Sequence, residues 1–119
     1  MAEVTLLHNR TCGSSRRALA WLRDHGIDVD VVEYLKTPLG RDELAELVAL
    51  LPTPPRELVR RDKRFAQLGL TDDDVADADA VISLLAEHPE LLQRPIVRAG
   101  DRAVIARPPE ATLETFFAG

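Results

Sequence analysis

The sequence predicts an α/β fold in which helices cover a four-stranded sheet of mixed strand direction. Three observations support this prediction. The N-terminal part alternates strand, helix and strand patterns, the middle contains only helical patterns, and the C-terminal part has two short strands followed by a helix. With 119 residues, 45% of them hydrophobic, the chain is long enough to bury one core. We therefore expect residues 1–119 to form a single domain that needs no disulfide.

The first strand, helix and strand are predicted from local patterns. Residues 4–7 are rich in strand-forming side chains and lead into a polar loop. From Ser15 to His25, apolar residues recur at helical spacing, and Gly26 is placed to stop this helix. Residues 29–34 are again typical of a strand. This order predicts a βαβ unit with a right-handed crossover.

The middle of the chain is predicted to be helical throughout. After Gly40, an amphipathic helix with acidic residues in its first turn ends at Pro52. Shorter helical turns are expected at residues 54–59 and 65–70. Either Asp77 or Asp79 is placed to cap a further helix, which must end near His88 because Pro89 disfavours helical geometry in the residue before it.

The C-terminal part is predicted to form a hairpin and a helix. Residues 96–98 and 102–106 are strand-like and flank a three-residue connection that contains Gly100. Residues 109–117 place Leu113, Phe116 and Phe117 on one side of a final helix.

Composition excludes several classes of function. The 20 acidic residues outnumber the 15 basic ones, giving a net charge of -5, so general affinity for nucleic acid or for an anionic membrane is not expected. No apolar run is long enough for a signal peptide or a membrane span, which favours a cytoplasmic protein. No calcium loop, phosphate-binding loop or metal-binding pair of His and Glu is present, so we expect no metal and no bound cofactor.

Cys12 is the one cysteine of the chain, so no internal disulfide or CxxC pair can form. It lies between the first strand and the first helix, where free backbone N–H groups and the helix dipole stabilise a thiolate. A single cysteine is often only a small buried apolar residue. The small and polar neighbours of Cys12 favour the reactive interpretation.

Other groups near Cys12 carry weaker signals. His8, four residues earlier, could favour the thiolate as an imidazolium or could simply bond the backbone, and Arg16, one turn later, could reach an oxyanion or lie in solvent. All basic residues except Lys36 and Lys63 are arginine, so no single arginine is informative. Pro95 directly precedes a strand, and we expect its bond to Arg94 to be cis.

Several segments together resemble one known family in order and spacing. The matching segments are His8-Asn9-Arg10-Thr11-Cys12-Gly13-Ser14-Ser15-Arg16, Tyr34-Leu35, Arg41-Asp42-Glu43-Leu44, Leu68-Gly69-Leu70, His88-Pro89, Arg94-Pro95-Ile96-Val97 and Arg107-Pro108. The pattern closely resembles the glutaredoxin-dependent arsenate reductases, including the Spx-related members of that group. The resemblance implies a thioredoxin-like fold, a mixed four-stranded sheet with an inserted helical region.

The resemblance also implies roles for particular residues. Cys12 matches the nucleophilic cysteine, His8 matches the histidine that favours its thiolate, and Pro95 matches the cis-proline beside the active cysteine. The positions that match basic oxyanion-binding residues are Arg60, Arg94, Arg107 and, in the cysteine loop, Arg16. The implied partners are a small oxyanion, an external thiol such as glutathione as co-substrate, and glutaredoxin or an equivalent thiol donor. A monomer is expected.

Two other functions remain open at this stage. Arg10 stands where the family usually has proline, which changes the rigidity and charge of the loop and leaves open a glutathione-dependent thiol-disulfide reductase without arsenate activity. A non-catalytic Spx-type regulator that binds RNA polymerase is less favoured, because Ser15 stands where the second cysteine of its redox switch would be.

Overall fold

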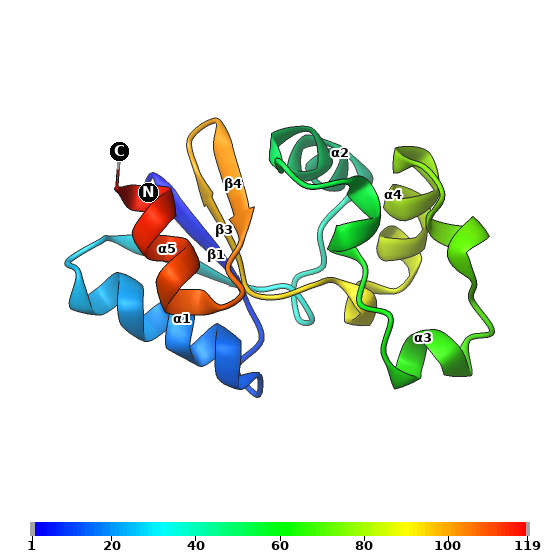
Figure 1. The fold of residues 1–119 in the computed structure, drawn as a ribbon, viewed down its shortest axis with the longest axis horizontal. Helices are drawn as coiled ribbons and strands as arrows, with labels where there is room; N and C mark the ends of the chain where they lie inside the picture. Colours follow the sequence, from blue (N-terminus) through cyan, green and yellow to red (C-terminus); the bar gives the residue numbers. More distant parts are fainter. Residues whose placement is uncertain (1, 119) are drawn as a thin grey trace. The chain divides into compact units, whose positions relative to one another are not determined.

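The computed structural model describes residues 2–118, which form two compact units (Figure 1). Unit 1 combines Met1–Thr37 with Arg94–Gly119, and unit 2 is the intervening segment Pro38–Gln93. Unit 1 contains all the strands of the described residues, and unit 2 is helical. The helical insertion implied by the family resemblance is therefore unit 2.

Unit 1 is built on a four-stranded mixed sheet. Its strands are β1 (Val4–His8), β2 (Val29–Glu33), β3 (Ile96–Ala99) and β4 (Arg102–Ile105), in the order β2-β1-β3-β4. β1 pairs in parallel with β2 and antiparallel with β3, and β3 pairs antiparallel with β4. The parallel pair comes from the βαβ unit and the antiparallel pair β3–β4 from the hairpin, so both sequence predictions are confirmed.

Two helices cover one face of this sheet (Figure 1). They are α1 (Gly13–Asp24) and α5 (Pro109–Phe117). Their apolar side chains and those of alternate strand residues form one buried core, which consists of Val4, Leu6, Ala18, Leu22, Val97, Ala106 and Leu113. The period of two in β1 and the helical period in α1 place these residues on facing surfaces. This core holds α1 against β1.

Strand register determines which distant residues come together at the end of the sheet where β1 leads into α1. Leu7 of β1 lies opposite Ile96 of β3, and Ile96 lies opposite Ile105 of β4. The residues just before Ile96 and just after Ile105 therefore extend past the end of β1. A hydrogen bond from the N–H of Ala106 to the carbonyl of Pro95, 2.9 Å long, ties these two segments together.

The proline bonds of the same region have defined isomers. The peptide bond between Arg94 and Pro95 is cis, and so is the bond between Arg107 and Pro108. The sequence analysis anticipated a cis bond only at Pro95.

Unit 2 is a set of short helices. Its elements are α2 (Arg41–Leu50), η1 (Pro55–Leu58), α3 (Lys63–Gln67), η2 (Asp72–Val75), α4 (Ala78–Glu87) and η3 (Pro89–Leu91), where η denotes a 3₁₀ turn. Glu43 accepts a hydrogen bond from the N–H of Gly40 at the start of α2. Of the two candidate caps of α4, Asp77 is the one used, since it accepts from the N–H of Ala80 at 2.8 Å. Across residues 2–118, every helix is too short or too polar to span a bilayer.

Candidate active site

Cys12 occupies the N-cap position of α1, where the chain leaves the sheet and enters the helix. The helix begins at Gly13, two residues earlier than the apolar pattern predicted. This difference matters because the N-cap residue faces the unsatisfied N–H groups of the first helical turn. The loop that carries it, residues 9–12, is called the Cys12 loop below. It is closed by a hydrogen bond of 3.0 Å from the N–H of Cys12 to the carbonyl of Asn9.

The surroundings of the thiol favour its ionised form. Partial burial of the sulfur raises the pKa of Cys12, but this effect is outweighed by groups that stabilise the thiolate. The N–H of Ser15, the guanidinium of Arg94 and the N–H of Ser14 all donate to the sulfur and lower its pKa. The pKa of Cys12 is consequently below its ordinary value. The site thus pairs a thiol with a cation and two backbone donors.

Arg94 and Arg107 meet at the end of the sheet. Strand register carries both residues past β1, and Nη1 of Arg107 donates to the carbonyl of Arg94 at 2.9 Å. Arg107 is exposed and Arg94 is half-buried. The structure therefore brings two of the arginines selected by the family resemblance into contact, one of them bonded to the Cys12 thiol.

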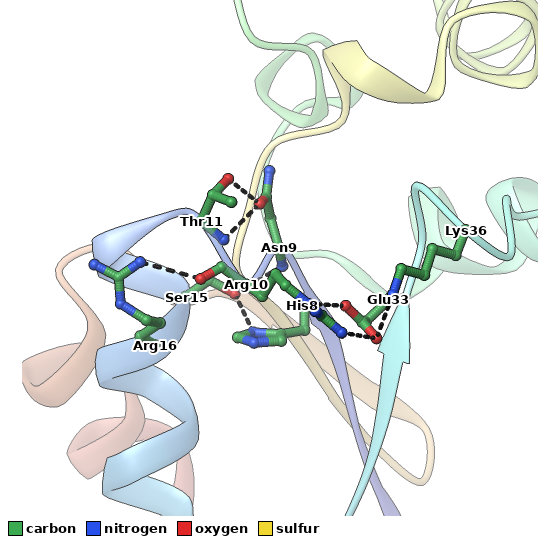
Figure 2. Close-up of polar contacts among 8 residues, drawn as sticks. All are labelled: His8, Asn9, Arg10, Thr11, Ser15, Arg16, Glu33 and Lys36. Carbon is green, nitrogen blue, oxygen red and sulfur yellow. Dashed lines mark hydrogen bonds and ion pairs between the residues drawn. The ribbon is translucent and has the colours of Figure 1, made fainter.

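His8 is a buried residue that bonds the start of α1. Its Nδ1 lies 2.6 Å from Oγ of Ser15, which also accepts a hydrogen bond of 3.0 Å from the N–H of Asn9 (Figure 2). Burial lowers the pKa of His8 below 6.5; Glu33 opposes this effect, and nearby arginines reinforce it. The lowered pKa favours the neutral form of the ring. Of the two roles that the sequence left open for His8, desolvation favours the neutral, hydrogen-bonding ring over the imidazolium.

Ser15 is a residue whose role the sequence analysis did not identify. Its side chain is fully buried, and its oxygen joins β1, the Cys12 loop and α1. The available signal was its position at the third residue of the helix, on the side that faces the strand. Because the Ser15 N–H also bonds the thiol, the hydroxyl contacts help to fix one of the donors to Cys12.

Arg16 contacts the loop backbone. Its Nη1 donates to the carbonyl of Arg10 at 3.0 Å, and its side chain is exposed (Figure 2). Asn9 braces the same loop, since its Oδ1 accepts from the N–H of Thr11 at 3.0 Å and from the Thr11 hydroxyl at 2.8 Å. Loop rigidity in this chain thus comes from side-chain hydrogen bonds.

Arg10, which replaces the usual proline, forms an ion pair. Its Nε and Nη2 donate to the two carboxylate oxygens of Glu33 at 2.7 and 3.2 Å (Figure 2). The pair joins the Cys12 loop to the end of β2 and lowers the pKa of Glu33. A paired, bidentate arrangement of this kind holds both partners in one orientation.

Arg60, the third arginine of the family pattern, belongs to unit 2. Its N–H donates to the carbonyl of Leu91 at 2.7 Å, next to the bridge between Val59 and Leu92. Its Nη1 lies 3.8 Å from Oδ2 of Asp62. The approach of Arg60 to Cys12 stays a prediction. Residues 2–118 contain no cluster of three or more side chains suited to hold a metal ion.

Comparison with known proteins gives a consistent result. A model of the ArsC family matches residues 7–115. The arsenate reductase of Escherichia coli is 37% identical over 115 residues, covering 96% of this chain and 81% of that protein. The arsenate reductase of Rhizobium meliloti is 41% identical over 93% of this chain and 79% of that protein.

Solved structures agree with the sequence comparison. The structure of the arsenate reductase from Vibrio cholerae superimposes with a TM-score of 0.79 at 36% identity, covering 93% of this chain and 95% of that one. The predicted fold, a thioredoxin-like mixed sheet with a helical insertion, is confirmed. Because the family model spans both units and the matched relatives align along most of their length, this chain belongs to the ArsC family.

Proposed function

We propose that this protein is a thiol-dependent arsenate reductase in which Cys12 is the nucleophile. The observation that carries the proposal is the surroundings of the Cys12 sulfur, where the Arg94 guanidinium and the N–H groups of Ser14 and Ser15 lower the thiol pKa. The same donors suit a tetrahedral oxyanion that approaches the sulfur. The relatives named arsenate reductase supply the substrate.

The proposed reaction begins with attack of the Cys12 thiolate on arsenic. A sulfur–arsenic bond forms and one arsenate oxygen leaves as water after protonation, which gives a thiol-arsenate adduct. A second thiol then attacks the Cys12 sulfur. A disulfide forms between the two sulfurs, and the electron pair of the broken sulfur–arsenic bond reduces arsenic from the pentavalent to the trivalent state. Arsenite leaves, and Cys12 is held in a mixed disulfide.

External thiols complete the cycle, because Cys12 is the only cysteine of the chain. Glutathione or a similar small thiol is the proposed attacking thiol, and glutaredoxin or an equivalent thiol donor is proposed to reduce the mixed disulfide. We propose that the protein works as a cytoplasmic monomer, in a compartment whose thiols are kept reduced.

Arginine is the suitable side chain for holding the oxyanion. Its planar guanidinium offers paired hydrogen bonds that match neighbouring oxygens of a tetrahedral anion, which an ammonium group cannot reproduce. Arg94 is supported by its bond to the thiol and Arg107 by its bond to the Arg94 carbonyl. Arg60 is included on the family resemblance. Arg16 would act mainly by holding the Arg10 carbonyl, and so the loop.

His8 is proposed as a positioning residue. A neutral, buried imidazole bonded to Ser15 holds the start of α1 in place, and with it the N–H that donates to the Cys12 sulfur. Its contribution would therefore come through orientation of the donors, without a positive charge on its ring.

The test is arsenate-dependent oxidation of NADPH, coupled through glutathione, glutaredoxin and glutathione reductase. We expect turnover with arsenate that is lost in Cys12→Ser. If the wild-type protein reduces a glutathione mixed disulfide but gives no arsenate-dependent signal, the thiol-disulfide reductase replaces this proposal. If neither activity is seen, and wild type and Cys12→Ser both capture RNA polymerase equally well, the non-catalytic regulator replaces this proposal.

A further inference from the structure

A small cavity lies beside the Cys12 loop in unit 1. Its volume is about 130 Å³, and its lining includes Asn9, Arg10 and Thr11 of the loop together with Glu33, Leu35 and Lys36. Figure 2 shows Arg10 of the loop pointing toward Glu33, with Lys36 on the other side of this carboxylate. A water molecule occupies roughly 30 Å³ in the liquid, so the cavity admits a group of several heavy atoms. The lining reaches Thr11, the residue adjacent to Cys12.

The charges of the lining favour an anionic group. Two cations, Arg10 and Lys36, lie against a single carboxylate, that of Glu33. Arg10 pairs with Glu33 through two hydrogen bonds, which offsets the repulsion that this carboxylate would exert on an anion. The Lys36 ammonium lies 3.7 Å from Glu33, beyond hydrogen-bond length, and its side chain is 65% exposed. The ion pair of Lys36 with Glu33 is therefore longer than that of Arg10 with Glu33.

The backbone around these groups is fixed. The N–H groups of Lys36 and Thr37 donate to the carbonyl of Glu33 at 2.9 and 3.0 Å, which forms a tight turn after β2. On the opposite side, Oδ1 of Asn9 accepts two hydrogen bonds from Thr11. These bonds fix the amide side chain of Asn9, which belongs to the lining of the cavity. The lining thus includes an exposed ammonium in a long ion pair and a fixed amide side chain.

We propose that this cavity binds a carboxylate of the small thiol co-substrate, with Lys36 as its ionic partner. A peptide thiol such as glutathione carries carboxylates a few bonds from its sulfur. Neighbouring Cα atoms lie about 3.8 Å apart, so a carboxylate held beside Thr11 leaves the thiol within reach of Cys12. The inference rests on the proposed function for the identity of the co-substrate, and it names a binding residue, Lys36, that the family pattern does not include.

The test uses the single cysteine and needs no arsenate. Cys12 is converted to its mixed disulfide with uncharged 4-thiopyridine, and release of thiopyridone is followed while glutathione concentration is varied. We expect the rate to saturate with glutathione. In Lys36→Gln, the half-saturating concentration should rise about fivefold or more, since a charge-assisted contact is lost. The rate with 2-mercaptoethanol, which has no carboxylate, should not change.

Lys63→Gln is the matched control, because Lys63 is the only other lysine of the chain and belongs to unit 2. It should leave the glutathione dependence as in wild type. An unchanged half-saturating concentration of glutathione in Lys36→Gln would overturn the proposal. With reduced glutaredoxin as the attacking thiol, a slower rate in Lys36→Gln that is not seen with glutathione would also overturn it, because Lys36 would then contact a protein thiol donor. A protein that passes this test but does not reduce arsenate would retain the thiol site and lose only the proposed substrate.

Discussion

At the scale of single residues, the groups that stabilise the Cys12 thiolate do not include the side chains of its neighbours in the sequence. Two of the donors to the sulfur are backbone N–H groups, and the third is Arg94, far away in the sequence. His8 and Arg16, the near neighbours with charge or potential charge, bond Ser15 and the Arg10 carbonyl. Only proline would remove a backbone donor, and it would change the backbone of the helix start as well, so Arg94 is the group through which the thiol pKa is best tested.

The first prediction is that Arg94→Gln raises the thiol pKa. In the wild-type protein, ultraviolet titration of the thiolate should give a midpoint below the ordinary value of about 8.5. Loss of the guanidinium removes a hydrogen bond and a positive charge, so the midpoint should rise. Arg102→Gln, on the hairpin, is the control and should leave it unchanged. A wild-type midpoint at or above the ordinary value would contradict the activated-nucleophile interpretation.

The second prediction concerns the pH dependence of stability through His8. Its pKa in the folded protein lies below 6.5, so the unfolded chain binds this proton more readily than the folded chain. The free energy of unfolding should therefore be highest above about pH 6.5 and fall as the pH is lowered through the folded pKa. The lowered carboxylate pKa values of Glu33, Glu90 and Glu110 act only below about pH 4.5.

Urea denaturation at pH 7.5 and 5.5 measures this effect, and His8→Gln should reduce the difference between the two values. A titration of the ring protons of His8 by NMR gives the pKa directly. A midpoint above 6.5 would favour the imidazolium, the other role that the sequence left open for His8.

At the scale of elements, the start of α1 supplies the backbone N–H groups that stabilise the Cys12 thiolate. Ser15 joins this helix end to β1 and to the loop through its single buried oxygen. The helix is also held by core packing of Ala18 and Leu22, further along the same face. Polar contacts therefore position the first turn, and apolar contacts position the rest.

The third prediction is that Ser15→Ala destabilises the fold. The substitution removes the Ser15 oxygen that bonds Nδ1 of His8 and the N–H of Asn9, and these two groups lie at a buried and a partly buried position. An unsatisfied buried group costs about 1–3 kcal/mol, which urea denaturation can resolve. Ser14→Ala is the matched control, since only its N–H contributes to the site, and should change stability by less than about 0.5 kcal/mol. Equal effects for the two serines would contradict the assigned role of Ser15.

At the scale of the whole molecule, strand register brings together, from segments that are distant in the sequence, residues that we propose bind the oxyanion. The antiparallel pairs bring the corner at Arg94 and the end of the hairpin at Arg107 to the edge where β1 leads into Cys12. The family pattern adds Arg60 from unit 2. A site of this kind exists only in the folded protein.

The fourth prediction is that Arg60→Lys, Arg94→Lys and Arg107→Lys keep the fold but lower arsenate turnover at least about tenfold. This corresponds to about 1.4 kcal/mol of lost transition-state stabilisation, because lysine cannot form the paired hydrogen bonds. Circular dichroism checks the fold, and Arg102→Lys is the control that should retain turnover. Normal turnover in Arg60→Lys alone would remove unit 2 from the site, and normal turnover in all three would argue against arsenate as substrate.

Much of the fold was predictable because its signals are local. The strand-forming side chains of residues 4–7, the helical spacing before Gly26 and the proline that ends α2 each act within a few residues, so elements and their order follow from the sequence. Boundaries were less certain, since either Asp77 or Asp79 could cap α4 and only the hydrogen bond to Ala80 selects Asp77. The single cysteine, likewise, determined that any redox cycle must use an external thiol.

Tertiary structure alone decided the electrostatics of the site. Whether His8 is charged depends on its burial, and whether Arg94 contacts Cys12 depends on the register of β1 and β3. Both are properties of residues separated along the chain, which no local pattern encodes. The sequence by itself determined the elements, their order and the single thiol of the chain; the packing of those elements determined which charges surround that thiol, because desolvation and contact between distant segments exist only once the chain has folded.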